Sequence, residues 1–113
     1  GADTALPMMY MPDAIRATLA LMDAPAEQVR ERHSYNLAGS SFTPAEIARA
    51  IAEELPGFEI GYAPDFRQAI ADSWPRSIDD AAAYADWGWR PDYDLRAMVR
   101  DMLLNLRREP VAA

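Results

Sequence analysis

The residues of this chain that are best suited to hold a small polar ligand lie between Asp65 and Pro91. Arg67, Asp72 and Trp74 fall in the stretch from Phe66 to Pro75, which we expect to be extended, and binding residues concentrate in such irregular segments. An arginine can hold a carboxylate or a phosphate through two parallel hydrogen bonds. The alternative for Arg67 is an ion pair with a local aspartate, such as Asp65 or Asp72.

The other reactive side chains have simpler structural explanations. His33 has no acidic partner at a telling spacing, which favours a loop position over a catalytic role. Asp79 and Asp80 stand in the first turn of an expected helix, where aspartates complement the helix dipole. Trp87 and Trp89 flank a glycine at the expected end of the same helix, so burial of their rings can anchor one helix against the next.

Several kinds of chemistry are excluded by residue types that the sequence lacks. There is no cysteine, no lysine and a single histidine. Thiol nucleophiles, a Schiff base, a Tyr-Lys proton relay and Cys or His metal clusters are therefore ruled out within this chain. The glycines stand at positions 1, 39, 57, 61 and 88, which fits no dinucleotide-binding G-x-G-x-x-G motif. We predict no catalytic, cofactor-binding or metal-binding residue here.

The length of 113 residues predicts a single domain, with frayed ends at residues 1–5 and 110–113. Half of the residues are hydrophobic, which is typical of a globular protein. The formal net charge of −7 argues against nucleic acid or an anionic membrane as a partner. No apolar run approaches the roughly 20 residues that a membrane-spanning helix needs.

The first part of the chain predicts a strand followed by a helix. The apolar run from Leu6 to Met11 is typical of a buried strand. A helix is expected from Pro12 to about Asp23, because proline suits a first helical turn and Pro25 disfavours continuation. Ile15, Leu19 and Met22 form one apolar face of this helix.

A second strand and a second helix are expected next. The segment from Ser34 to Leu37 is a short strand candidate. Thr43, Pro44 and Glu46 form a capping box at a helix start. The buried stripe of that helix consists of Ile47, Ile51 and Leu55.

The rest of the chain predicts one more strand and two helices. Alternating residues from Phe58 to Tyr62 indicate a half-buried strand. Ser77 to Asp80 reads as a second capping box, opening a helix from Ile78 to about Trp87 that stops at Gly88. Asp94 is expected to cap the last helix, whose apolar stripe consists of Leu95, Met98, Val99, Met102, Leu103 and Leu106. The fold class is α/β, with short strands and about four helices.

Three runs of the sequence resemble the C-terminal third of short-chain-type L-threonine 3-dehydrogenases: LPMMYMPDAIRATL, SYNLAGSSFTPAEIA and PDFRQAIADSWPRSIDDAAAYADWGWRPDYDL. These enzymes belong to the extended short-chain dehydrogenase/reductase superfamily, beside the NAD-dependent sugar epimerases and dehydratases. The resemblance covers the chain from about Leu6 to Leu106, and its RQAIADSWP and DWGW segments are specific to the threonine dehydrogenase branch.

The resemblance implies a small substrate-binding lobe without its Rossmann core. The full enzymes oxidise the 3-hydroxyl of L-threonine with NAD to 2-amino-3-ketobutyrate. A Rossmann domain holds NAD and carries a Ser/Thr–Tyr–Lys set, so this chain is expected to bind no cofactor and to be inactive alone. In this reading Arg67 and Asp72 contribute charge at the rim of the L-threonine site, and Trp74 shields the substrate from water.

Two alternatives stay open. The chain can be a free-standing interaction module that forms homo-oligomers through exposed apolar surface. It can also be the same lobe of a sugar-nucleotide epimerase or dehydratase, although such enzymes usually follow the arginine equivalent to Arg67 with Pro, Gly and Asp. Here Gln68, Ala69 and Ile70 follow it. No secretory or transit segment is visible, so we expect a cytoplasmic location, and the alanine- and arginine-rich composition suggests a bacterial source.

Overall fold

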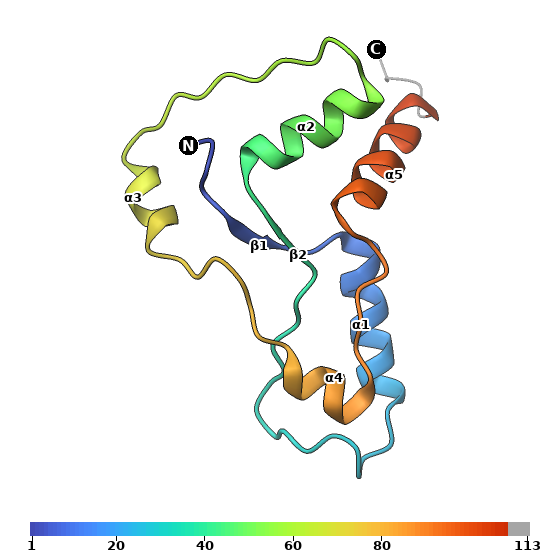
Figure 1. The fold of residues 1–113 in the computed structure, drawn as a ribbon. Coiled ribbons are helices and arrows are strands. Elements are labelled where there is room, and N and C mark those ends of the chain that lie inside the picture. Colours follow the sequence, from blue (N-terminus) through green and yellow to red (C-terminus); the bar gives the residue numbers. More distant parts are fainter. Residues whose placement is uncertain (109–113) are drawn as a thin grey trace, which may run out of the picture.

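The computed structural model describes residues 1–108, which form five helices and one two-stranded sheet (Figure 1). The predicted α/β class is confirmed, with one helix more than expected. The predicted frayed tail at residues 110–113 lies outside the described residues. The strands are β1 (Leu6–Met8) and β2 (Ser40–Phe42), and the helices are α1 (Met11–Asp23), α2 (Pro44–Glu54), α3 (Arg67–Asp72), α4 (Ala81–Trp87) and α5 (Leu95–Arg108).

The sheet pairs β1 with β2 in antiparallel register, so that Leu6 lies opposite Phe42 and Met8 lies opposite Ser40. It sits between α2 and α5 on one side and α1 and α4 on the other (Figure 1). Gly39 enters β2 so close to β1 that a Cβ atom there would lie 2.6 Å from the carbonyl oxygen of Met8. The predicted strand from Leu6 to Met11 is shorter than expected, because α1 already begins at Met11.

The helix ends follow the local signals of the sequence. In α2 the hydroxyl of Thr43 accepts from the backbone N–H of Glu46 (3.1 Å), and the Glu46 carboxylate accepts from the N–H of Thr43 (2.8 Å), which completes the predicted capping box. Asp94 accepts from the N–H of Ala97 (2.8 Å) at the start of α5. Gly88 ends α4 in the left-handed conformation, with φ of 74°, a backbone geometry that glycine adopts most easily.

Two predicted strands are wrong. The segments 34–37 and 58–62 form no helix or strand in the described chain. A strand needs the backbone of a neighbour to pair with, and β1 and β2 are the one pair that residues 1–108 supply. The alternating apolar residues from Phe58 to Tyr62 therefore make no backbone pairing with a neighbouring strand in the described chain.

The second predicted capping box is also wrong. Helix α4 begins at Ala81 rather than at Ile78, and its N-cap residue Asp80 makes no capping contact with its side chain. The carboxylates instead bond elsewhere: Asp79 accepts from the N–H of Ala81 (3.0 Å), and Asp80 accepts from the N–H of Ala38 (3.3 Å).

The core is small for a chain of this length. Ala17, Ala83 and Trp89 are its buried members, and Met9, Tyr35, Leu37 and Trp87 pack around them. A second contact joins α2 to α5, where Ala50 and Val99 are buried. The radius of gyration is 17.0 Å, against about 13 Å for a compact domain of this size. Among residues 1–108 no helix is long and apolar enough to cross a membrane.

Candidate functional site

The segment that carries Arg67 and Asp72 is a short helix, so the predicted extended conformation is wrong here. Arg67 to Asp72 form α3, and the run R-Q-A-I-A-D contains mainly good helix formers. Asp65 opens the turn by accepting from the N–H of Arg67 (2.9 Å). At the other end the hydroxyl of Ser73 donates to the carbonyl of Ile70 (2.6 Å), and Pro75 disfavours a further turn.

Arg67 makes its ion pair with a neighbour in sequence. Its guanidinium lies 2.6 Å from the carboxylate of Asp65, and the two side chains are 76% and 42% exposed. The hydrogen bonds from Arg67 hold the pKa of Asp65 below its ordinary value, and the carboxylate in turn raises the pKa of Arg67. Local pairing with Asp65, the alternative foreseen for Arg67, is confirmed, whereas a role for Arg67 in ligand binding stays a prediction.

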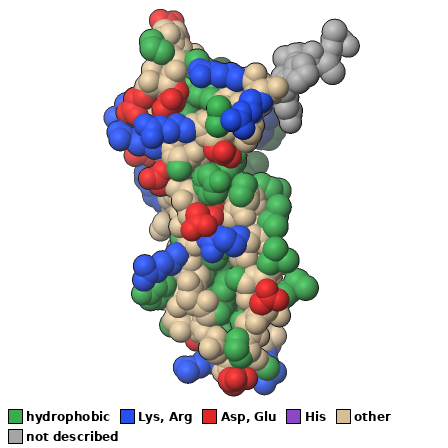
Figure 2. All heavy atoms as spheres, turned by 90° about the vertical axis from the view of Figure 1, so that its right-hand side faces the viewer, with side chains coloured by type: hydrophobic (Ala, Val, Ile, Leu, Met, Phe, Trp, Pro, Cys, Tyr) green, Lys and Arg blue, Asp and Glu red, His purple; other side chains and the backbone are tan. Residues whose placement is uncertain are grey.

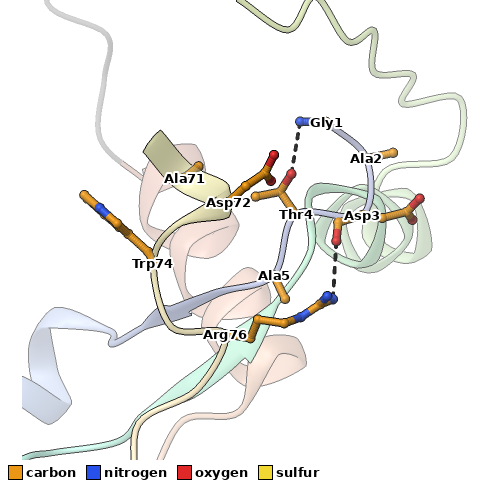
Figure 3. Close-up of a pocket in the computed structure, with 9 residues that line it drawn as sticks. All are labelled: Gly1, Ala2, Asp3, Thr4, Ala5, Ala71, Asp72, Trp74 and Arg76. Atoms are coloured by element: carbon orange, nitrogen blue, oxygen red, sulfur yellow. Dashed lines mark hydrogen bonds between the residues drawn. The ribbon is translucent and has the colours of Figure 1, made fainter. Parts of the chain in front are cut away.

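Asp72 and Trp74 line one hollow of about 300 Å³ with the first residues of the chain (Figure 3). Asp72 points toward Thr4, whereas the Trp74 indole extends away from residues 1–5 (Figure 3). Gln68 links the two walls, because its amide nitrogen lies 2.8 Å from the Asp72 carboxylate and 2.7 Å from the Thr4 hydroxyl. The lining residues are Gly1, Ala2, Asp3, Thr4, Ala5, Ala71, Asp72, Trp74 and Arg76.

A second, apolar hollow of about 370 Å³ lies beside the first and shares Trp74 with it. Arg67 lines this second hollow together with Leu6 and Ile70. The three predicted residues therefore line two neighbouring hollows. Arg67 lines one, Asp72 lines the other, and Trp74 lines both. Trp74 stands between them, 57% exposed.

Sequence reasoning missed Arg76 as a residue of the site. Its guanidinium reaches the backbone carbonyl of Asp3 at 3.5 Å, across 73 positions of sequence. The signal in the sequence that could have indicated Arg76 is the position of a basic residue directly after Trp74 and Pro75. Side chains of both charges, those of Asp3, Asp72 and Arg76, thus line one hollow, and opposite charges at one hollow suit a small zwitterion.

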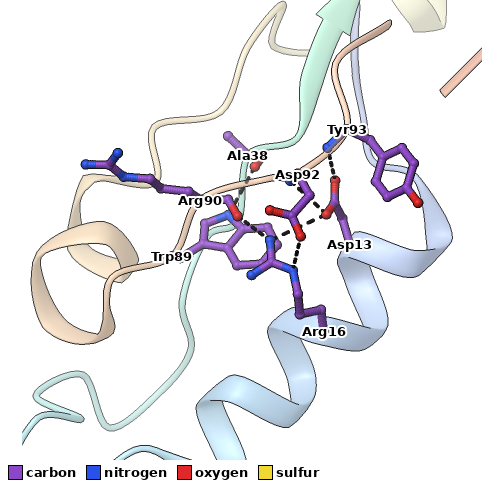
Figure 4. Close-up of polar contacts among 7 residues, drawn as sticks. All are labelled: Asp13, Arg16, Ala38, Trp89, Arg90, Asp92 and Tyr93. Carbon is purple, nitrogen blue, oxygen red and sulfur yellow. Dashed lines mark hydrogen bonds and ion pairs between the residues drawn. The ribbon is translucent and has the colours of Figure 1, made fainter. Parts of the chain in front are cut away.

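A second group of polar residues fastens α1 to the chain after α4 (Figure 4). Asp13 is 1% exposed and accepts from the backbone N–H groups of Asp92 (2.9 Å) and Tyr93 (3.0 Å). Arg16 pairs with the Asp92 carboxylate at 2.9 Å and lies over the Trp89 ring, 4.7 Å from its centroid. Since these groups contact one another rather than an open hollow, we assign them to holding α1 in position.

The two tryptophans around Gly88 pack as predicted. Trp89 is 2% exposed, and its indole N–H donates to the carbonyl of Ala38 (3.1 Å). Trp87 lies against Trp89, with 6.1 Å between ring centroids, and meets Tyr35 edge-on. The buried role of Asp13 depends on Asp92 and Tyr93, 79 and 80 positions away in sequence, so local sequence signals do not indicate it.

Other titratable groups offer little reactivity. Tyr10 donates to the Asp101 carboxylate (2.7 Å), and this hydrogen bond raises the pKa of Tyr10 to about 12, so its phenol stays protonated at neutral pH. His33 is exposed. Within residues 1–108 no cluster of three or more His, Cys, Asp or Glu side chains is placed to hold a metal ion.

Comparison with known proteins finds relatives of this chain among proteins about three times as long. The chain matches no protein-family model. It is 52% identical over 101 residues to the mitochondrial L-threonine 3-dehydrogenase of Sus scrofa, covering 88% of this chain and 27% of that protein. It is 47% identical over 102 residues to an uncharacterized epimerase/dehydratase of Staphylococcus saprophyticus, covering 89% of this chain and 32% of that protein.

Solved structures give the same result. The GalE-like L-threonine dehydrogenase of Cupriavidus necator in its apo form superposes with a TM-score of 0.90 at 66% identity, over 94% of this chain and 38% of that one. The L-threonine dehydrogenase of Clostridium difficile superposes with a TM-score of 0.93 at 41% identity, over 99% of this chain and 35% of that one.

In fold and sequence the chain is similar to the GalE-like threonine dehydrogenases and the epimerase/dehydratase proteins. Its matches cover the C-terminal portion of L-threonine 3-dehydrogenases and of epimerase/dehydratase proteins, and the predicted resemblance is confirmed. The chain spans about a third of the length of these relatives.

Proposed function

We propose that this chain is the substrate-binding C-terminal part of an NAD-dependent L-threonine 3-dehydrogenase and that it is inactive without the rest of that enzyme. One observation carries the proposal: 66% identity and a TM-score of 0.90 to the Cupriavidus necator L-threonine dehydrogenase over 94% of the chain. The mitochondrial L-threonine 3-dehydrogenase of Sus scrofa supports the same substrate.

The proposed reaction converts L-threonine and NAD⁺ to 2-amino-3-ketobutyrate, NADH and a proton. NAD supplies the acceptor for the hydride that leaves C3, and the hydroxyl proton passes to a base. This chain has no lysine and no glycine motif for a pyrophosphate, so its residues do not fit the cofactor. We assign cofactor binding and proton transfer to the remainder of the parent enzyme.

The part assigned to this chain is one wall of the substrate cleft. Asp72 and Arg76 line the same hollow and present a negative and a positive group to the ammonium and carboxylate of an amino acid. Trp74 excludes water from the reacting carbon, which strengthens the electrostatic interactions inside the closed site. Arg67, held by Asp65, contributes positive charge at the rim.

A chimera tests this assignment. The present chain replaces the matching region of the Cupriavidus necator enzyme, and NADH formation is followed with L-threonine as substrate. We expect kcat/KM within about tenfold of the unmodified enzyme, because only one wall of the site is exchanged. A folded chimera that binds NAD but does not oxidise L-threonine would contradict the proposal.

The second candidate is the corresponding lobe of an epimerase or dehydratase, which the 47% identity to the Staphylococcus saprophyticus protein favours. The residues after Arg67 argue against it, since Gln68 is engaged with Thr4 and Asp72 rather than free to meet a nucleotide sugar. Incubating the natural full-length parent with NAD and either L-threonine or UDP-glucose separates the two. Turnover of the sugar nucleotide alone would favour the second candidate.

A further inference from the structure

The side chain of Gln68 is engaged at every polar atom. Its amide nitrogen donates to Oδ1 of Asp72 (2.8 Å) and to the hydroxyl of Thr4 (2.7 Å), and its amide oxygen accepts from the nitrogen of Gly1. A primary amide has two N–H donors and one acceptor oxygen, so both donors and the oxygen are already in use. Gln68 is partly buried and does not line the hollow that Asp72 and Thr4 share.

The two acceptors of Gln68 come from different parts of the chain. Asp72 follows Gln68 by four positions on α3, which places both on one face of the helix. Thr4 precedes β1 and is 64 positions away from Gln68. Asp72 points toward Thr4 in the hollow (Figure 3). Gln68 therefore connects α3 with the segment before β1 and sets how two lining side chains stand to each other.

These hydrogen bonds leave two defined groups for a ligand. Among residues 1–108 the side-chain hydrogen bond of Asp72 ends at Oδ1, so Oδ2 is free to accept from an ammonium group. The Thr4 oxygen is the acceptor in its bond with Gln68, and the hydroxyl hydrogen is therefore available to donate. A negatively charged acceptor and a hydroxyl donor at one hollow match the ammonium and the carboxylate of an amino acid.

We propose that Gln68 is a positioning residue of the L-threonine site, holding Asp72 Oδ2 toward the ammonium and the Thr4 hydroxyl toward the carboxylate of the substrate. This inference rests on the proposed function and adds Thr4 to the substrate wall. Gln68 itself does not touch the substrate. A residue that only fastened α3 would affect the stability of the protein, whereas a positioning residue affects the affinity for L-threonine.

The test uses the chimera with the Cupriavidus necator enzyme, and isothermal titration calorimetry measures its Kd for L-threonine. NADH replaces NAD, so that no turnover occurs. Gln68→Ala is expected to raise this Kd about tenfold, because the Asp72 carboxylate then rotates away from the ammonium. Asp72→Ala is expected to raise it about a hundredfold, since it removes the charge itself.

The double variant measures whether Gln68 acts through Asp72. If it does, Gln68→Ala should add only about two- to threefold to the loss caused by Asp72→Ala, the remainder arising from Thr4. Gln68→Met keeps a long side chain without N–H donors and is expected to match Gln68→Ala. The KM for L-threonine of each active variant should follow its Kd, while the KM for NAD stays within about twofold.

A polar link on another side of the molecule is the matched control. Arg100 donates to Glu54 (2.7 Å), which joins α5 to α2 across 46 positions. Arginine and acidic side chains gather in the upper half of the face in Figure 2, on the side where α5 lies, whereas α3 lies on the other side (Figure 1). Glu54→Ala should leave the Kd for L-threonine within about twofold. Gln68→Ala should leave the thermal midpoint within about 2 °C.

Three results would overturn the inference. One is a Gln68→Met chimera with the unmodified Kd, which would show that the amide is not needed. Another is a double variant with the full product of the two losses, about a thousandfold. The third is a lowered thermal midpoint with an unchanged Kd, which would assign Gln68 to fastening α3.

The proposed function is judged by different results of the same experiment. A chimera that oxidises L-threonine but shows any of these three results keeps the proposed function and loses the inference. A chimera that binds L-threonine with the expected pattern but does not oxidise it contradicts the proposed function alone. An unmodified chimera that does not bind L-threonine contradicts both.

Discussion

Two regions of the molecule differ in how firmly their residues are held. Around α1 and α4 the buried carboxylate of Asp13 and the ring of Trp89 join segments that are distant in sequence. Between Pro56 and Arg76 no residue is buried, and the polar contacts of Arg67 are with its sequence neighbour Asp65. The first region can maintain its geometry alone. The second region exposes most of its side chains, and its contacts with the rest of the chain include those of Gln68 with Thr4 and of Arg76 with Asp3.

The largest predicted difference in stability is between the two tryptophans. Trp89→Ala should lower the free energy of unfolding by about 3–5 kcal/mol, because it removes a buried ring from a small core. Trp74→Ala should change it by less than about 1 kcal/mol, since the side chain is 57% exposed. Urea denaturation followed by circular dichroism measures both. Equal losses would show that the α3 segment is part of the core.

The next effect concerns Asp13. Asp13→Ala leaves two backbone N–H groups, those of Asp92 and Tyr93, without an acceptor, and a loss of about 2–3 kcal/mol is expected. Asp79→Ala is the control, because its carboxylate is exposed and caps one N–H; a change of less than about 1 kcal/mol is expected. The same denaturation experiment compares them, and the prediction fails if Asp13→Ala is the milder change.

Much of the fold was predictable where the signal is local. The Thr43 capping box, the left-handed Gly88 and the Asp94 cap each depend on residues within four positions, and all three are present. The segments 34–37 and 58–62 failed as strands because residue types and alternation indicate a propensity for extended backbone, not the presence of a neighbouring strand.

The candidate site shows the same limit. Its predicted residues are close in sequence, but Arg67 and Asp72 line different hollows. Helix α3 was missed because a hydrogen bond from Arg67 to Asp65 opens it, and a six-residue helix leaves little periodicity to detect. Arg76 and Thr4 line the same hollow although they are far apart in sequence, and no spacing rule places them there.

A smaller effect is expected at Tyr10, in the firmly held region. The Asp101 carboxylate raises the Tyr10 pKa to about 12, which stabilises the protonated phenol in the folded state. The resulting contribution to stability is complete below pH 10 and is lost as the pH rises toward 12. Asp101→Asn should lower the Tyr10 pKa toward its ordinary value in an ultraviolet titration, and an unchanged pKa would contradict the assigned hydrogen bond.

The smallest effect is expected in the exposed region, at Asp65. Because Arg67 lowers the Asp65 pKa, the pair stabilises the fold above the ordinary pKa of 3.8, and the contribution is lost as the pH falls through the lower folded-state value. Arg67→Gln should return the Asp65 pKa toward 3.8 in a carbon-detected NMR titration. Added salt should reduce the difference between the two proteins.

The most direct test of the substrate wall is the kcat/KM for L-threonine of the chimera carrying Trp74→Ala. The account predicts a loss of about tenfold or more from exposure of the reacting group to water, with most of it restored in Trp74→Phe. Phe58→Ala, which removes a partly exposed ring outside the hollow, should leave kcat/KM within about twofold. If Trp74→Ala matched Phe58→Ala in both kcat and KM, the α3 segment would not form a wall of the site.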